Sequence, residues 1–107
     1  MAIGFDSMEA WLLQKQWQQY QSQRDILVSE KLAKNAELDT TQAQIEKLQN
    51  ILPIITNRTS KLQQLSEQKH ATEDQYLLAE QTRIETQQDL ISQRSNLRQL
   101  RASLKSL

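Results

Sequence analysis

The side chains best able to do chemistry gather in one short polar stretch of the sequence. His70 is the only histidine in the chain, and the carboxylates of Glu67, Glu73 and Asp74 follow or precede it by a few residues. Such groups can bind a metal ion, but one imidazole among loop carboxylates is a weak ligand set for zinc. There is no cysteine to supply a thiolate ligand or a thiol nucleophile. We therefore expect no metal site and no cofactor here.

A basic row near the C-terminus is the second candidate for chemistry. Its members recur every three or four residues, as on one helix face: Arg94, Arg98, Arg101 and Lys105. Such a face could follow phosphates, but the 13 basic and 13 acidic side chains of the chain cancel, which leaves no overall positive field for nucleic acid or anionic lipid. Cations also favour the C-terminal end of a helix dipole. We expect no nucleic-acid partner and no direct membrane contact.

The composition favours long helices over a compact enzyme domain. Only 37% of the 107 residues are apolar and 5% aromatic, and the chain has one glycine and one proline. A rod of helices offers no enclosed cleft in which carboxylates acquire the shifted pKa values of acid–base catalysis. No apolar run approaches the roughly 20 residues that span a bilayer, and the chain opens with no signal peptide. We expect no catalytic residue, and either a cytosolic protein or a soluble piece of a larger one.

The first two thirds of the chain carry a regular apolar row. It runs with spacings typical of heptads through Leu13, Trp17, Tyr20, Leu27, Leu38, Thr41, Ile45, Leu48, Leu52, Ile55, Thr59 and Leu62. Asp6 and Glu9 form a helix-start signal, so the pattern predicts a helix over about 6–68. Pro53 lies inside this helix. Because the row keeps its phase on both sides, we expect a kink at Pro53 and not a break.

A second helix is predicted over about 72–106, after a tip loop at about 69–71. Thr72 and Gln75 match a capping box, and Glu73 and Asp74 place negative charge where the helix dipole favours it. The apolar positions of this helix are Tyr76, Leu77, Ile84, Leu90, Ile91, Leu97, Leu100 and Leu104.

Two helices joined by so short a loop must run antiparallel. If the chain folds about Lys69, residues pair where their numbers add to about 138, and apolar layers then meet. These layers are Leu62 with Tyr76, Ile55 with Ile84, Leu48 with Leu90, Thr41 with Leu97, and Leu38 with Leu100. The sequence predicts an all-α fold in which residues 1–107 form a single long antiparallel two-helix coiled-coil hairpin with a longer first helix.

The first quarter of the longer helix has no partner within such a hairpin. Trp11, Leu13, Trp17 and Tyr20 lie there, and a large exposed apolar stripe usually marks an interaction site. We expect a homo-oligomer in which residues 8–30 pair as an antiparallel or staggered dimer.

The residues around the turn carry a family resemblance. Leu52-Pro53 precedes the stretch from Leu62 to Leu77, which reads LQQLSEQKHATEDQYL. A Leu-Pro before the tip, a short loop, and a Ser or Thr that starts the return helix before a Tyr-Leu resemble the coiled-coil hairpin of HlyD-type membrane fusion proteins, the periplasmic adaptors of type I secretion. The resemblance covers about residues 10–107. It departs at Lys69, where the family commonly has a glycine.

The resemblance also implies a docking tip. Related efflux adaptors carry an Arg, a Leu four residues on and a Ser seven beyond that, and Lys61, Leu65 and Thr72 stand at these spacings. Lys61 departs from this pattern, because its single ammonium group lacks the two-pronged guanidinium of arginine. With the loop included, the implied docking residues are Lys61, Leu65, Gln68, Lys69, His70 and Thr72.

The implied function is protein transport across the periplasm of a Gram-negative bacterium. An inner-membrane-anchored adaptor of this family assembles in a ring and links an inner-membrane ABC transporter to a TolC-like outer-membrane channel, which the hairpin tips meet. The lipoyl, β-barrel and transmembrane parts that contact the transporter are not in this sequence, so the chain is expected to be a soluble hairpin. The alternative is a generic structural coiled-coil tether or scaffold subunit. A metal- or nucleic-acid-binding helical module is a third class.

Overall fold

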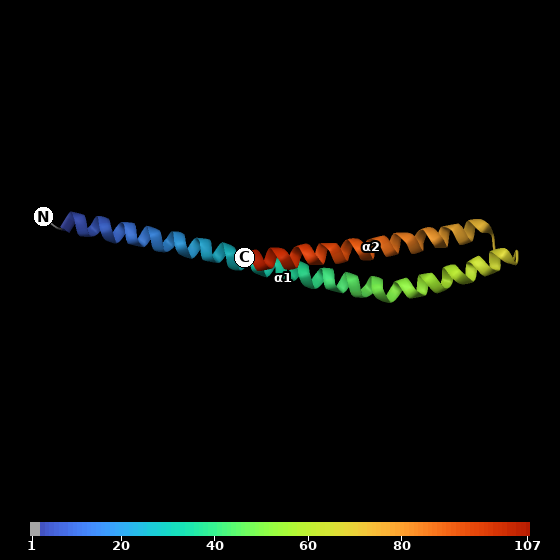
Figure 1. The fold of residues 1–107 in the computed structure, drawn as a ribbon. Helices are drawn as coiled ribbons and strands as arrows, with labels where there is room; N and C mark the ends of the chain where they lie inside the picture. Colours follow the sequence, from blue (N-terminus) through green and yellow to red (C-terminus); the bar gives the residue numbers. More distant parts are fainter. Residues whose placement is uncertain (1–2) are drawn as a thin grey trace.

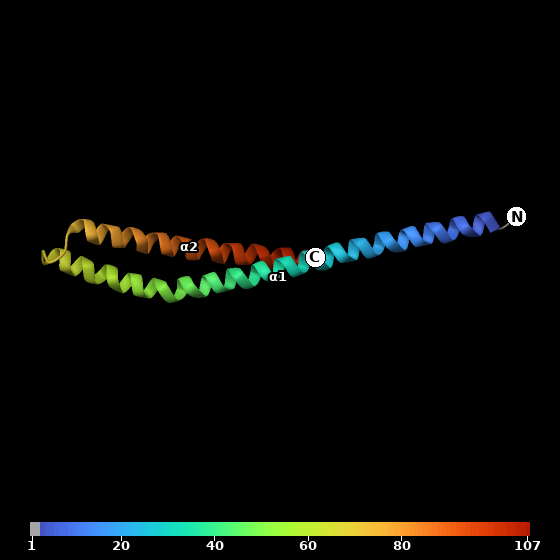
Figure 2. The ribbon, with the colours of Figure 1, turned by 180° about the vertical axis from the view of Figure 1, so that it is seen from behind.

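Two α-helices joined by a short tip make up the molecule (Figure 1). The computed structural model describes residues 3–107, in which α1 runs Ile3–Glu67 over 65 residues and α2 runs Glu73–Ser106 over 34. The helices lie side by side and antiparallel, and the particle measures 101 × 18 × 15 Å. Figure 2 shows from behind that the C-terminus ends partway along α1, whose N-terminal part extends alone. The predicted all-α hairpin with a longer first helix is confirmed.

A single heptad seam holds the two helices together. In α1 all eight predicted seam positions of the hairpin are buried or half-buried: Leu38, Thr41, Ile45, Leu48, Leu52, Ile55, Thr59 and Leu62. The hydroxyl of Thr59 reaches the carbonyl oxygen of Ala79 in α2 at 3.3 Å, and these two residue numbers add to the expected 138. The predicted register is therefore the observed one.

The seam of α2 differs from the predicted one. Leu77, Ile84 and Ile91 were expected in it, but their side chains are 51%, 46% and 50% exposed. The inward positions include small and polar residues instead: Ala79, Arg83, Thr86 and Gln93. These positions belong to one series whose spacing alternates between three and four residues. Its other members are Tyr76, Leu90, Leu97, Leu100 and Leu104. The predicted layer of Ile55 with Ile84 is thus wrong, and the facing residue in this register is Arg83.

Pro53 lies within α1, and the helix continues through it. Its ring is exposed, because position 53 lies on the face turned away from α2, next to the inward Leu52. Proline has no amide hydrogen to donate to the carbonyl oxygen of Gln49. This carbonyl lies on the same exposed side of α1, where water can hydrate it. The green part of α1 also bows away from α2, and the two helices come closer together at both ends of their paired stretch (Figure 1). Pro53 thus bends the helix without ending it.

The N-terminal start of α1 lies earlier than predicted. The helix begins at Ile3, so Asp6 is a residue of its first turns and does not occupy the N-cap position. A helix can extend past a start signal when the preceding residues carry no breaker, and Gly4 alone is too weak to end one. Further along, residues 7–33 are all exposed, and in the observed register α2 ends level with residue 32.

Candidate functional site

The tip begins with a tight C-terminal cap on α1. The amide of His70 donates to the carbonyl of Leu65 at 2.8 Å, and the amide of Lys69 donates to the carbonyl of Ser66 at 3.0 Å. These two bonds define a Schellman motif, in which the residue after the cap takes a left-handed conformation. Lys69 fills that position with φ of 62°. The lysine therefore occupies a position where glycine would be favoured. The resembled family commonly has a glycine at this same position.

Helix α2 starts with the predicted capping box. The amide of Gln75 donates to the Thr72 hydroxyl oxygen at 3.2 Å, and the amide of Thr72 donates to the Gln75 side-chain oxygen at 3.1 Å. Glu73 and Asp74 occupy the first turn, where negative charge meets the positive end of the helix dipole. The tip is thus a turn of five residues, 68–72, held by backbone hydrogen bonds on one side and by the capping box on the other.

All six predicted docking side chains are exposed at this end of the hairpin: Lys61, Leu65, Gln68, Lys69, His70 and Thr72. Lys61 and Leu65 lie four residues apart and so share one face of the last turns of α1, and Gln68 follows three residues later, directly after the helix end. Leu65 is 40% exposed, which leaves an apolar contact on an otherwise polar end. The arrangement can offer one apolar anchor among several hydrogen-bond donors.

The polar side chains around His70 are spread over the end of α1, the turn and the start of α2. Among residues 3–107, no three histidine, aspartate or glutamate side chains lie close enough together to hold a metal ion. Glu67 ends α1, whereas Glu73 and Asp74 start α2.

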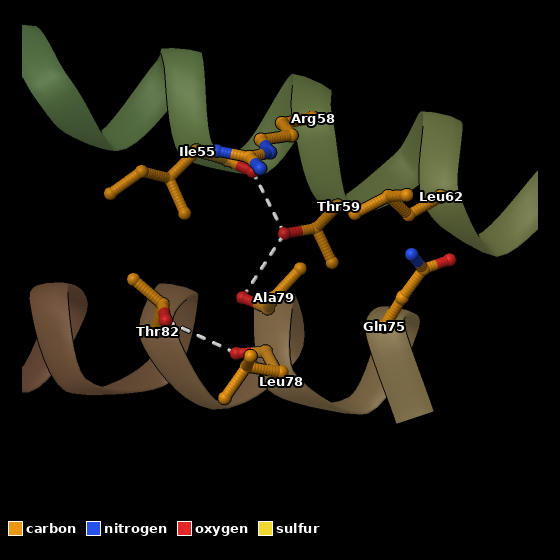
Figure 3. Close-up of a pocket in the computed structure, with 8 residues that line it drawn as sticks. All are labelled: Ile55, Arg58, Thr59, Leu62, Gln75, Leu78, Ala79 and Thr82. Carbon is orange, nitrogen blue, oxygen red and sulfur yellow. Dashed lines mark hydrogen bonds between the residues drawn. The ribbon is translucent and has the colours of Figure 1, made fainter. Parts of the chain in front are cut away.

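A groove between the helices lies beside the tip and was not expected from the sequence. It has a volume of about 330 Å³ and is lined by Ile55, Arg58, Thr59, Leu62, Gln75, Leu78, Ala79 and Thr82. Figure 3 shows Thr59 at its centre, with its hydroxyl 2.8 Å from the Ile55 carbonyl and 3.3 Å from the Ala79 carbonyl. The hydroxyl has one proton, which these two acceptors share. Small residues at seam positions 59 and 79 are the signal that could have located this groove.

On α2, Arg83 and Glu80 form an ion pair of 2.6 Å with both carboxylate oxygens engaged. The hydrogen bond from Arg83, and then its charge, hold the pKa of Glu80 below its ordinary value. A further bond from Arg83 to the Gln87 side-chain oxygen, at 3.1 Å, fixes the guanidinium along the helix. These bonds satisfy an arginine that occupies a seam position.

The predicted self-association residues lie on the unpaired part of α1. Trp11, Leu13, Trp17 and Tyr20 are between 57% and 66% exposed. The rings of Trp17 and Tyr20 stack with their centroids 5.9 Å apart, and the Lys15 ammonium lies 5.7 Å from the Trp11 ring. These contacts stay within one helix and leave most of the apolar surface open.

The fold and the tip together define a class: an antiparallel coiled-coil hairpin that presents an exposed, hydrogen-bonded turn at the end of a long rod. The family model described as "CyaD, alpha-helical hairpin domain" matches residues 6–106. This chain therefore belongs to the CyaD alpha-helical hairpin domains, hairpins of the membrane-fusion-protein type. Neither curated proteins nor solved structures gave a match. In the described part of the chain, neither helix has an apolar stretch that could cross a bilayer.

Proposed function

We propose that this hairpin is the periplasmic arm of a type I secretion adaptor, and that its tip docks on a TolC-like outer-membrane channel. The observation that carries the proposal is the family match over residues 6–106 together with an exposed, hydrogen-bonded tip at the end of a rod. In this function the adaptor, anchored in the inner membrane of a Gram-negative bacterium, links an ABC transporter to the channel. The transporter contacts belong to other parts of the adaptor.

The tip suits weak and repeated contacts. Leu65 supplies an apolar anchor, while Lys61, Gln68, Lys69 and His70 supply donors to a partner's carbonyl or carboxylate oxygens. Each tip offers too small a surface for stable binding alone. Several tips in a ring engage one channel together, and the effective concentration of the remaining tips raises the affinity after the first has bound.

A ring requires side-by-side contacts between hairpins, and α2 carries a second apolar row that fits this need. Leu77, Ile84 and Ile91 recur every seven residues, so they share one face of α2. They are about half exposed, because α1 covers only the neighbouring seam. We assign this row to contacts between neighbouring copies in the ring.

Pull-down of a purified TolC-like channel by the immobilised chain tests the docking. Leu65→Ser should reduce channel capture severalfold at unchanged helicity. Leu32→Ser is the matched control, because Leu32 is a more exposed leucine, at 66%, far from the tip. Equal capture by wild type and Leu65→Ser would contradict the docking role. Absence of capture by the wild type would favour a generic coiled-coil tether.

A further inference from the structure

The paired part of the hairpin has two long faces, one on each flank of the seam. One of them, the groove face, carries the groove near the tip, which Arg58, Leu78 and Thr82 line (Figure 3). Each of these three residues directly precedes a seam residue of its own helix. Ile54 also directly precedes a seam residue, lies one turn before Arg58, and is 69% exposed. The groove face is therefore hollow near Thr59 and bordered by exposed apolar side chains.

The opposite face, the row face, carries the outer apolar row of α2: Leu77, Ile84 and Ile91. Successive residues of a helix are about 100° apart, so a residue after a seam position and a residue before it lie on opposite flanks. Ile84 directly follows the seam residue Arg83, whereas Thr82 of the groove directly precedes it. One hairpin thus offers a hollow on one face and a protruding row on the other.

A closed ring fixes how these two faces can meet. In the proposed ring every tip points toward the channel, and rotation about the ring axis moves no residue along that axis. Neighbouring upright hairpins therefore bring the groove face of one copy to the row face of the next, with residues at equal height. Heights within the hairpin are known, since level residues of α1 and α2 have numbers that add to 138, as Thr59 and Ala79 show. The register between copies then follows without a free choice.

This register matches apolar surface with apolar surface. Ile54 of the groove face lies level with Ile84 of the row face, and both side chains are exposed in a single hairpin. The other two row residues lie level with lysines of the groove face: Leu77 with Lys61, and Ile91 with Lys47. The methylene stem of a lysine can cover an apolar neighbour while its ammonium group stays in water.

The same register also matches charges at two heights. Arg58 on the groove face lies level with Glu80 on the row face. Arg83 engages both carboxylate oxygens of Glu80, but each oxygen keeps a lone pair for a second donor. Further from the tip the order of charge is reversed, because Glu37 on the groove face lies level with Arg101 on the row face. Opposite charges therefore meet at both heights.

We infer that the groove face of one hairpin binds the outer row of α2 from a second copy of this chain, with residues of equal height in contact and both tips pointing the same way. The inference rests on the ring of the proposed function and deepens it by naming the two surfaces that meet. The row of the second copy covers the groove, whose α2 lining from Gln75 to Thr82 spans nearly the same heights as Leu77 and Ile84.

Disulfide trapping tests the register, since the described part of the chain has no cysteine. A chain that carries both Ile54→Cys and Ile84→Cys should give a ladder of covalent dimers, trimers and larger species on mild oxidation. The two thiols lie on opposite faces of one hairpin, so they cannot bond within it. The matched control carries Ile54→Cys and Ile91→Cys, which moves the second thiol by seven residues, or about 10 Å, and should give severalfold less ladder.

Three outcomes of the trapping would overturn the inference. One is a ladder from the control pair but not from the level pair, which would exclude the stated register. Another is covalent dimer from Ile54→Cys alone or Ile84→Cys alone at the yield of the double variant, because like faces would then meet. The third is no ladder from either pair at high protein concentration.

A charge swap in the level-pair variant tests the electrostatic match. Among the residues that the structure describes, neither Glu37 nor Arg101 has an ion-pair partner within the hairpin. Arg101→Glu should lower the ladder yield severalfold at unchanged helicity, because it sets two carboxylates at one height. Adding Glu37→Arg should restore the yield. These two side chains lie on opposite faces of one hairpin, so restoration requires contact between copies, and its absence would contradict the charge pairing.

Channel pull-down by the same variants separates this inference from docking at the tip. A chain that captures the channel but gives no ladder would overturn the contact between copies and leave the docking role of Leu65 intact. A ladder without channel capture would support the contact between copies and contradict the docking.

Discussion

Thr59 of α1 donates its hydroxyl proton toward the carbonyl oxygen of Ala79 in α2 at 3.3 Å, across the interface of the hairpin. Thr59 is only 4% exposed, so this contact lies in the seam and is shielded from water. Its donor also bonds the Ile55 carbonyl within α1. The pair marks the register of the two helices close to the tip.

Substitution of Thr59 separates the roles of its hydroxyl and its methyl group. Thr59→Val should change the free energy of unfolding by less than about 1 kcal/mol, because both acceptor carbonyls lie within helices and can keep their backbone bonds. Thr59→Ala should cost more, about 1–2 kcal/mol, because it opens a void in the seam. Urea unfolding followed by circular dichroism measures both values. A loss for valine as large as that for alanine would show that the hydrogen bond dominates, because both variants lack the hydroxyl.

Lys69→Gly should stabilise the tip. Lys69 has φ of 62°, and a left-handed backbone costs a residue with a Cβ about 1 kcal/mol relative to glycine. Part of this gain is offset by the greater freedom of glycine in the unfolded chain, so we expect a net gain of about 0.5 kcal/mol in unfolding free energy. Glu67→Gly, within α1, is the control and should destabilise. Lower thermal stability for Lys69→Gly would contradict the assigned strain.

Thr72→Ala should loosen the start of α2. It removes the acceptor of the Gln75 amide, and loss of such a cap costs about 1 kcal/mol. Hydrogen exchange at Gln75 should therefore accelerate, while exchange at Leu90 in the middle of α2 should change less. Thr72→Ser keeps a hydroxyl at this position and should restore protection. Slow exchange at Gln75 in the alanine variant would mean that the capping box contributes little.

Acid should weaken the contribution of the Glu80–Arg83 pair. The pKa of Glu80 is lowered in the folded protein from its ordinary 4.5 by the hydrogen bond of Arg83. A lowered pKa gives stability that is present above the unfolded value and is lost as pH falls through the folded value. Wild type should thus exceed Glu80→Gln in stability at pH 7, by a small amount because the pair is partly exposed. This difference should shrink below pH 4.5; a constant difference would disprove the linkage.

The sequence predicted α1 better than α2, for a physical reason. The inward positions of α1 between 38 and 62 are apolar or threonine, so hydrophobicity alone identifies them. In α2, Arg83 and Gln93 occupy inward positions while Ile84 and Ile91 point outward. α1 covers only those residues of α2 that follow the alternating three- and four-residue spacing of a heptad. An apolar residue one position away from this series stays exposed.

At the tip, local rules were sufficient for the backbone but not for the groove. The capping box at Thr72 and the anomaly at Lys69 follow from residue types within a few positions of the turn. The groove around Thr59 depends on which α2 residues face it, and Ala79 was not recognised as a seam residue. The docking role assigned to Lys61 and Leu65 stays a prediction, since their exposure shows only that they are accessible.

The difference in length between α1 and α2 has a mechanical consequence. Two helices packed side by side resist bending more than one does, because material further from the bending axis carries the load. A lateral force on the tip would therefore leave the paired part of the rod nearly straight and concentrate the deflection in residues 7–30, where α2 does not lie beside α1. The uncovered segment is therefore the part of the hairpin that would bend first under such a force, and a helix packed on its seam would stiffen it.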